Sequence, residues 1–540
     1  MTGRPKLDGE GAAIHREPRR SEMTGSALTP QKVLFLATGL AGSFLVNLSA
    51  QFASTNIADI QGGLSSTADE GSWILTAYTM GSCVGVVISG LLIGALSIGR
   101  YLVASSVLFA AAAIACAITA DLGTMIAFRS VQGFAAGGYG PAAFVAIFMV
   151  AGGPRLPYAV IILAFSLLFA GTAGPVISGF VEEIFGWRSL FLIQAAIGAL
   201  LALAARLWAP NNAPNWPALK ADWMAITLLS LALMSLVLVL NQGTRRFWFE
   251  SEMIVWGTLV SVAAWAGFAF AIRFSPLPFI TPGLLVTRRF GIPIGLNFLL
   301  RAGLVVSSYL VPQFLAIVQG YSSFEISELM LWAAAAQLIA LPLVWWFLHL
   351  CDLRLIMGLG VVLLAFGTAL MVNGTALSAG EQFWQALAIY SAGQLLLLAP
   401  AMVVGTGSLK PADLPTASLV FNMSNLVGTT LGVGFISNVV TERQKVHSGA
   451  LFEGASLGQA FDVDRISSLA ALASRMADDA GALLSAQIAS GAQRQTWALA
   501  FADGFLVVAI LLMLGTVAIA AIGRSPPLRR PVKISQGETP

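Results

Sequence analysis

The chain has 540 residues, of which 57% are hydrophobic and 10% are charged. Soluble domains carry about 25% charged residues, so this composition excludes an ordinary water-soluble protein. The 29 basic and 26 acidic side chains leave a net charge of +3, which is too small and too dispersed to indicate a nucleic-acid partner.

Residues 1–32 are polar and basic, without the apolar core and cleavage site of a secretory signal, and we expect them to form a cytoplasmic tail. The apolar runs that follow have the length of about 20 residues that a helix needs to cross a bilayer. They predict an all-α integral membrane protein with fourteen transmembrane helices, at about 33–56, 72–94, 99–119, 124–148, 157–181, 187–208, 222–241, 253–273, 291–317, 326–349, 354–374, 382–405, 416–440 and 500–523.

The basic residues outside these runs gather mostly on the side of the N-terminal tail. Cytoplasmic loops carry an excess of Lys and Arg, so we expect both termini in the cytoplasm and the chain in a bacterial-type cytoplasmic (inner) membrane. The proline-containing segment 274–290 looks like a linker between two halves. The expected parts are the tail 1–32, a six-helix bundle at 33–208, a linker region with two extra spans at 209–290, a second six-helix bundle at 291–525 and a cytoplasmic tail at 526–540.

The second bundle is expected to include a polar outer loop at 441–499. Apolar residues recur within it at a spacing of three or four, which predicts an amphipathic helix. This helix either caps the protein's own outer surface or docks a partner. Its apolar positions are Ile466, Leu469, Leu472, Met476, Ala480 and Leu483.

No enzyme signature is present: the chain has no phosphate-binding loop, no His near a nucleophile and no paired carboxylates. Cys83, Cys116 and Cys351 lie in or beside apolar runs without the spacing of metal ligands. We therefore expect no catalytic residue, cofactor or metal.

The fourth span contains a full positive charge, Arg129, among small and apolar residues. Such a charge is costly unless it faces a cavity or a partner. Arg129 and Gln132 are candidate transport or coupling residues, whereas Gly133 and Gly137 allow close helix packing. The alternative is that Arg129 only ties helices together.

In the fifth span, Pro175 breaks the backbone ladder beside Gly174 and ahead of Gly179, which predicts a kinked and closely packed helix. The stretch 186–191 then opens the sixth span. With these motifs, residues 33–525 resemble the fourteen-span drug:proton antiporter family of the major facilitator superfamily. The resemblance implies a major facilitator fold of two six-helix bundles plus two linker spans, and export of drugs or amphiphilic molecules by proton antiport.

The sequence departs from the family pattern at three places. Ser49 stands where the family has an aspartate in its first span, and the stretch 96–100 keeps only the end of the usual loop motif after the second span. Ser424 lies near the position of a frequent arginine. The usual proton-coupling carboxylate is thus missing from its usual place.

Coupling by protonation needs a carboxylate whose charge can change as the cavity alternates. The acidic residues lie near span ends, and Asp59 and Asp503 are the remaining candidates. Arg301 shares a polar helix face with Asn297, and this face either lines the cavity or pairs with a neighbouring helix. Aromatic candidates for the substrate cavity are Phe52, Tyr78, Tyr139, Tyr309 and Tyr390.

The expected function is that of a secondary transporter whose partners are a small-molecule substrate, protons and the lipid bilayer, with a periplasmic adaptor protein as a further candidate. Two alternatives remain open: an exporter of one endogenous metabolite, and a transport-inactive membrane scaffold or sensor.

Overall fold

The computed structural model describes residues 29–220, 222–275, 280–456, 480–523 and 528. Within these residues, fourteen helical segments are long and apolar enough to cross a membrane, so the predicted all-α class and number of spans are confirmed. They are Pro30–Thr55, Ala68–Leu96, Ile98–Ile118, Leu122–Val150, Gly153–Phe185, Trp187–Trp208, Trp223–Gln242, Glu252–Phe274, Arg288–Gln319, Ser323–Leu350, Leu353–Met371, Trp384–Thr406, Pro411–Leu451 and Ser490–Ala520.

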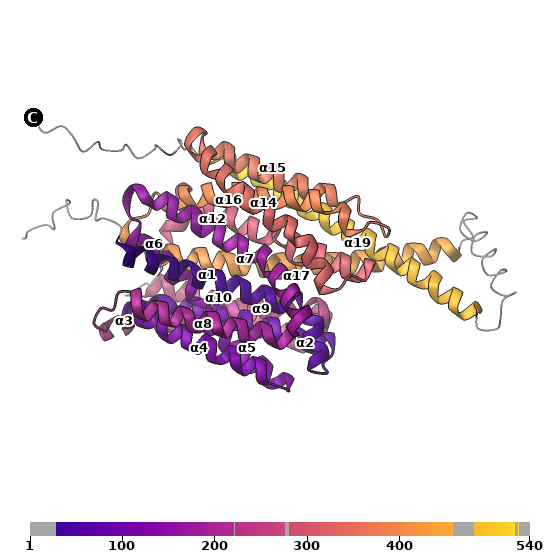
Figure 1. Ribbon diagram of the computed structural model, residues 1–540, viewed down its shortest axis with the longest axis horizontal. Helices are drawn as coiled ribbons and strands as arrows, with labels where there is room; N and C mark the ends of the chain where they lie inside the picture. Colours follow the sequence, from indigo (N-terminus) through magenta and orange to yellow (C-terminus); the bar gives the residue numbers. More distant parts are fainter. Residues whose placement is uncertain (1–28, 221, 276–279, 457–479, 524–527, 529–540) are drawn as a thin grey trace, which may run out of the picture.

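Successive spans run in opposite directions, from left to right or from right to left in Figure 1, so the start of the first and the end of the last lie on one side of the bundle. We call this side the tail face and the other side the hairpin face. The helices of the first half are α1 (Pro30–Thr55), the short α2 (Ile57–Gly63), α3 (Ala68–Leu96), α4 (Ile98–Ile118), α5 (Leu122–Gly137), α6 (Tyr139–Val150), α7 (Leu156–Phe185) and α8 (Trp187–Trp208).

The two extra spans are α9 (Trp223–Gln242) and α10 (Glu252–Phe274). α9 packs against α3 of the first half and α17 of the second, whereas α10 packs mainly on α9. Only 28% of the most apolar stretch of α10 is buried, against 78% for the span of α16. α10 is therefore a peripheral span that buries few of its residues against the rest of the protein.

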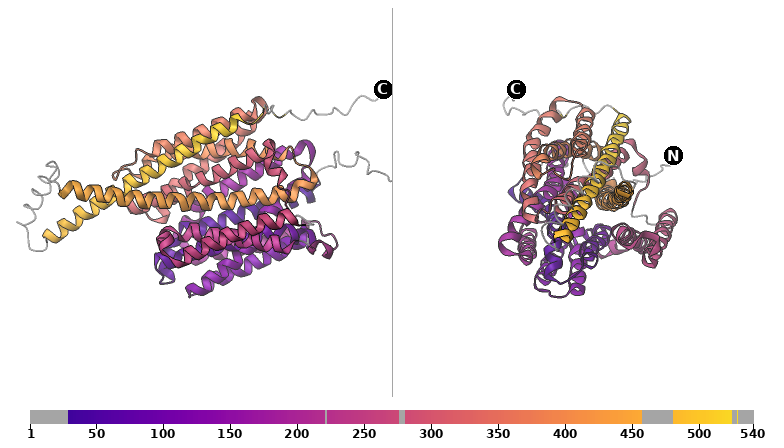
Figure 2. Two further views of the ribbon diagram at one scale, coloured as in Figure 1. Left: turned by 180° about the vertical axis from the view of Figure 1, so that it is seen from behind. Right: turned by 90° about the vertical axis from the view of Figure 1, so that its right-hand side faces the viewer.

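The second half starts with α11 (Gly283–Val286) and α12 (Arg288–Gly303), which continues through two π-helical turns around α13 (Val311–Phe314). It then comprises α14 (Ser323–Leu350), α15 (Leu353–Met371), α16 (Trp384–Thr406), α17 (Leu414–Ser456) and α19 (Ala480–Ala520). Figures 1 and 2 show both halves side by side, with α17 and α19 projecting beyond the others at the hairpin face.

This projection corrects the expected polar loop at 441–499. α17 has 43 residues and α19 has 41, so at 1.5 Å per residue each is roughly twice as long as a bilayer core is thick. The described parts of the segment, 441–456 and 480–499, are helical. The apolar positions Ile466, Leu469, Leu472 and Met476 lie outside the described residues, as do most of both tails.

Glycines bring α3 and α5 into backbone contact. A Cβ atom on Gly133 would lie 2.0 Å from the Tyr78 carbonyl oxygen, and one on Gly137 would lie 2.4 Å from that of Ser82. In return, a Cβ on Gly81 would lie 2.1 Å from the Ser130 carbonyl oxygen. Small residues of this kind let membrane helices approach closely. Helices in lipid associate through such van der Waals contacts, because the hydrophobic effect does not drive their association there.

We predict that Gly133→Ala lowers the unfolding temperature of the purified protein in detergent, because the new methyl group has to push α5 away from α3. Overpacking of this kind costs about 1–3 kcal/mol. The matched control is Gly358→Ala on α15, where a Cβ meets no atom within 4 Å. Equal unfolding temperatures for the two variants would show that α3 and α5 separate without cost.

Candidate functional site: two buried arginines and the contact between halves

Arg129 lies on the second turn of α5, which begins at the hairpin face. The amide and hydroxyl of Thr124 donate to the Asp121 carboxylate, both at 2.7 Å, and so cap the helix. The same bonds lower the pKa of Asp121 below its usual value, the hydroxyl contributing most. This cap and the glycine contact with α3 fix the depth and direction of Arg129.

The Arg129 side chain is fully buried among neutral groups. Its Nη1 donates to Gln132 Oε1 at 2.6 Å and to Ser49 Oγ at 3.4 Å. The guanidinium carbon lies 4.2 Å from the centroid of the Tyr78 ring and 5.7 Å from that of Phe191. This arrangement brings the predicted Arg129, Gln132 and Tyr78 together.

Gln194 completes the enclosure and was not predicted from the sequence. Its Oε1 accepts from Ser49 Oγ at 2.5 Å and from Gln132 Nε2 at 3.0 Å. A lone glutamine in the otherwise apolar sixth span was the available signal. Ser49 thus contacts Arg129 at the position where the drug:proton antiporter family has an aspartate. Its neutral hydroxyl cannot compensate the positive charge of Arg129.

Arg129 Nε and Nη2 have no hydrogen-bond partner. A charged side chain at the centre of a membrane helix costs roughly 3 kcal/mol on insertion scales, and unpaired guanidinium donors add to that cost. The enclosure therefore lowers the cost by cation–π contact and two hydrogen bonds without removing it.

Arg301, the second predicted arginine, lies on α12 and is 3% exposed. Its Nε and Nη2 also lack partners. One turn earlier, Asn297 Nδ2 donates to Ser424 Oγ at 2.7 Å and to Asn425 Oδ1 at 2.8 Å, both on α17. The polar face of α12 therefore turns toward α17.

Arg129 and Arg301 are the buried charged side chains among the residues that the structure describes, and no Asp or Glu of that set is buried. Each half of the protein thus holds one guanidinium without an acid partner.

The Gly-Pro segment of α7 lies at the contact between the halves. Ser327 Oγ of α14 donates to the Pro175 carbonyl oxygen at 2.7 Å. A Cβ on Gly179 would lie 1.9 Å from that same Ser327 Oγ, and one on Gly174 would lie 2.6 Å from the Gln51 Cβ of α1. The three predicted residues therefore hold α7 against both α14 and α1.

A chain of polar side chains crosses the same contact deeper in the membrane. Thr172 Oγ1 of α7 donates to Gln337 Oε1 at 2.8 Å, and Gln337 Nε2 donates to Gln394 Oε1 of α16 at 2.8 Å. These residues were not predicted from the sequence. They join the first half to two helices of the second.

The predicted aromatic residues have different surroundings. Tyr139 donates to Ser106 Oγ at 2.9 Å and Tyr390 to the Gly303 carbonyl oxygen at 2.6 Å. Phe52 is fully enclosed and Tyr309 is half-buried. Rings that are bonded or enclosed in this way pack helices against one another.

The pocket between the halves is lined by other aromatic rings. They belong to Phe144, Phe290 and Phe421. None of the five aromatic residues predicted from the sequence lies in its wall. That those five side chains line the substrate cavity therefore stays a prediction.

The two candidate carboxylates lie toward the hairpin face. Asp59 Oδ2 of α2 accepts from Ser323 Oγ of α14 at 3.3 Å, so it bridges the two halves. Asp503 Oδ2 of α19 accepts from Arg443 Nε at 2.5 Å and lies 2.8 Å from His447 Nε2, both on α17. Asp503 therefore ties the two projecting helices together within one half.

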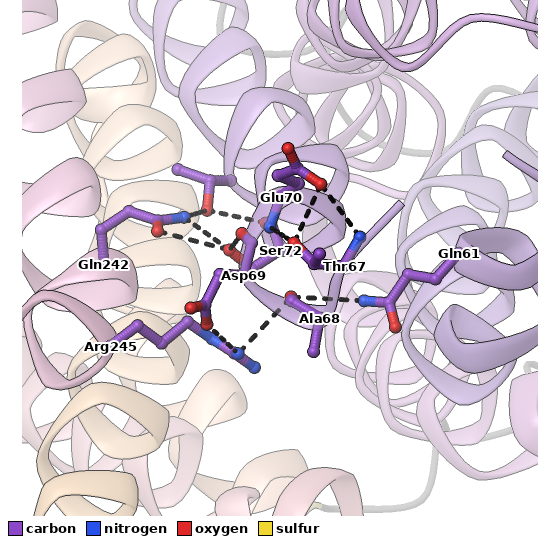
Figure 3. A network of polar contacts seen from close by, with 9 residues as sticks. Gln61, Thr67, Ala68, Asp69, Glu70, Ser72, Gln242 and Arg245 are labelled. Carbon is purple, nitrogen blue, oxygen red and sulfur yellow. Dashed lines mark hydrogen bonds and ion pairs between the residues drawn. The ribbon is translucent and has the colours of Figure 1, made fainter. Parts of the chain in front are cut away.

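A further polar network joins α3 to the first extra span at the hairpin face (Figure 3). Gln242 Nε2 donates to Ser72 Oγ at 3.0 Å and to Thr76 Oγ1 at 2.9 Å. Arg245 pairs with Asp69 at 3.2 Å, both largely exposed. Exposed pairs contribute little, so the buried glutamine fixes α9 on α3.

Comparisons with known proteins agree with this architecture. The family model described as Major Facilitator Superfamily matches residues 39–433. Colistin resistance protein EmrB of Acinetobacter baumannii is 22% identical over 404 residues, which cover 74% of this chain and 79% of the relative. Multidrug export protein EmrB of Escherichia coli K12 is 24% identical over 440 residues, covering 78% and 83%.

Among solved structures, the proton:xylose symporter XylE aligns with a TM-score of 0.54 at 11% identity, covering 91% of this chain and 95% of its own. At that identity the likeness concerns the fold alone. The family model spans most of the fourteen-helix region, and the predicted resemblance to the antiporters is confirmed. The chain belongs to the Major Facilitator Superfamily.

Proposed function

We propose that this protein is a proton-coupled exporter of drugs or amphiphilic small molecules. The observation that carries the proposal is the contact between the halves, where Pro175 and Gly179 of α7 pack on Ser327 of α14. Alternating access requires two bundles that move against each other around a central site. Two of the relatives are named for multidrug export or colistin resistance, which supports export as the direction.

The tail face is proposed to be cytoplasmic, because most basic residues outside the spans lie on its side. Both termini then lie in the cytoplasm of a bacterial-type cell, and α17 and α19 project into the periplasm. A periplasmic adaptor protein is a candidate partner there. The bundles 33–208 and 291–525, with the linker region 209–290 between them, are the proposed moving units.

Asp59 is the proposed coupling carboxylate. The hydrogen bond between Asp59 and Ser323 joins α2 to α14 at the hairpin face and has to break when this face opens. Protonation of Asp59 removes the charge that strengthens this bond. Asp503 is paired with Arg443 and His447 inside one half, so its protonation has no direct route to the contact between halves.

A transport-inactive scaffold is the second candidate, since Ser49 leaves Arg129 without a titratable partner. An exporter of a single metabolite would use the same architecture as a multidrug exporter. Export of amphiphilic dyes distinguishes a multidrug exporter from a scaffold.

We predict that expression in a bacterium lacking its own efflux pumps lowers the accumulation of amphiphilic dyes several-fold. Collapse of the proton gradient should restore accumulation, because the gradient drives export. The measurement is cellular dye fluorescence, with Arg129→Ala at matched expression as the inactive control. Equal accumulation in cells with the wild type, with Arg129→Ala and with an empty vector would reject multidrug efflux.

We predict that Arg129→Met abolishes export while the unfolding temperature stays equal to that of the wild type or rises. Methionine fills a similar volume without burying an unpaired charge, and such replacements are often neutral or stabilising. Thermal unfolding in detergent and dye efflux measure the two effects. Loss of folded protein would show instead that Arg129 holds the helices together.

We predict that Asp59→Asn uncouples transport: substrate still moves down its gradient in proteoliposomes, while the accompanying proton flux falls at least tenfold. A pH-sensitive dye inside the vesicles reports the flux. Asp503→Asn is the matched control and should keep coupling, because its carboxylate is bound within one half. The reverse pattern would assign coupling to Asp503.

A further inference from the structure

A cavity lies at the hairpin face, where the loop between α9 and α10 meets the start of α3. Its volume is about 410 Å³, within the range of about 300–1,000 Å³ that is typical of ligand pockets. It is lined by Asp69 of α3, by Gln242 at the end of α9 and by loop residues 245–247, 250 and 251. We call this site the hairpin cavity. It has room for a small polar group.

The loop that forms the hairpin cavity is held in place by Trp248. The Trp248 indole Nε1 donates to Asn438 Oδ1 of α17 at 2.7 Å, and the Trp248 amide donates to the Gly243 carbonyl oxygen at 2.8 Å. Phe247 and Trp248 have a left-handed backbone, with φ of 55° and 53°, which residues other than glycine rarely adopt. The rings of Phe247 and Phe249, on either side of Trp248, are each 66% exposed. The fold thus shapes this loop and presents two aromatic rings on its outside.

Opposite charges line the hairpin cavity without all neutralising one another. Arg245 pairs with Asp69 at 3.2 Å (Figure 3). The side chains of Arg246 and Glu250, in contrast, have no ion pair or hydrogen bond with any residue that the structure describes. Both line the same cavity, so a guanidinium and a carboxylate border one space without binding each other. A ligand that carries an anionic and a cationic group can bind both of them at once.

The cationic part of the hairpin cavity fits a phosphate group. Arg245 and Arg246 are adjacent in the chain and both line the cavity. Guanidinium groups bind phosphate oxygens through parallel N–H donors. Two arginines in a short loop at the hairpin face also run against the excess of basic residues on the tail face. Glu250 complements an ammonium group, so a phosphate and an ammonium group joined by a short linker match the charges of the cavity.

The position of the cavity along the spans favours a lipid as the source of these two groups. α9 ends at Gln242 and α10 begins at Glu252, so the loop lies where two spans leave the apolar core, at the level of the lipid headgroups. Aromatic side chains gather at this level in membrane proteins, and Phe247 and Phe249 expose their rings there. Contacts between exposed charges are individually weak. Acyl chains keep a lipid beside the site at a high local concentration, which a free zwitterion lacks.

We propose that the hairpin cavity binds the headgroup of a zwitterionic phospholipid. The lipid phosphate binds Arg246, its ammonium group binds Glu250, and its acyl chains lie in the bilayer beside Phe247 and Phe249. This site is separate from the two buried arginines and from the contact between the halves. The inference therefore stands or falls independently of what the protein exports.

The test compares two phospholipids with identical oleoyl chains, phosphatidylethanolamine and phosphatidylglycerol, added to the purified protein in detergent. Native mass spectrometry measures the Kd of the first bound lipid. We expect phosphatidylethanolamine to bind at least fivefold more tightly, because both lipids offer a phosphate and only this one offers an ammonium group. Equal affinities, or tighter binding of phosphatidylglycerol, would overturn the inference.

Substitutions with matched controls assign the two groups. Glu250→Gln should weaken binding of phosphatidylethanolamine to the level of phosphatidylglycerol, whereas Glu252→Gln, an exposed acid outside the cavity wall, should keep the preference. Arg246→Gln should weaken both lipids at least fivefold, whereas Arg188→Gln, an exposed arginine at the start of α8, should weaken neither. The comparison of two lipids within one variant stays informative where a substitution lowers stability. A preference that survives Glu250→Gln would contradict the proposed site.

Glycerophosphoethanolamine, the same headgroup without acyl chains, distinguishes a lipid from a water-soluble zwitterion. We expect no binding of this compound at concentrations that saturate the site with phosphatidylethanolamine. Binding as tight as that of the lipid, and lost in Glu250→Gln, would show that the cavity takes a soluble ligand and would overturn the lipid as its occupant.

Discussion

A positive charge enclosed in an apolar interior without an acid is the constraint on which the rest of the structure depends. Arg129 is held by neutral oxygens and aromatic rings, and two of its nitrogens stay unpaired. Such a group raises the free energy of the folded state. The fold has to offset this cost by packing elsewhere, and close packing lies beside it, where glycines bring the backbones of α3 and α5 into contact.

Glycine also allows close packing at the contact between the halves, but there it meets a side-chain hydroxyl and not a backbone. In α3 and α5, glycine meets backbone, and the two helices form one rigid unit. In α7, Gly179 meets the Ser327 hydroxyl, which also binds the Pro175 carbonyl oxygen. The hydroxyl can rotate and exchange acceptors at little cost, whereas two backbones in contact can only separate. Rigid packing inside a half and polar contacts between halves are what relative motion of the halves requires.

Much of the fold follows from the sequence, because crossing a bilayer imposes a length and a polarity that can be counted along the chain. The fourteen spans were predicted for this reason. The extension of α17 and α19 was missed because a polar helix outside the membrane needs no fixed length and no apolar composition. Charged residues such as Arg443 and Lys445 occur both in helices and in loops. Within the candidate site, Arg129 and Arg301 stand out in any apolar run, whereas the partners Gln194, Gln337 and Gln394 are single polar residues whose direction depends on how distant helices meet. The roles of the aromatic residues could not be predicted for the same reason. Tyr390 donates to a backbone carbonyl, whereas Phe144 and Phe421, which have no polar atom in the side chain, line the pocket.

The neutral residue at position 49 changes the energetics of opening. An acid there would compensate Arg129 in every conformation in which the two stayed together, and opening would have to hydrate both charges. With Ser49, the enclosed state carries an unpaired charge, and access of water or an anion to Arg129 relieves its cost. The enclosed state must then be maintained by contacts that do not involve charge. The packing of α7 on α14 and the chain from Thr172 through Gln337 to Gln394 are of that kind, so the strength of these neutral contacts sets how readily the protein opens.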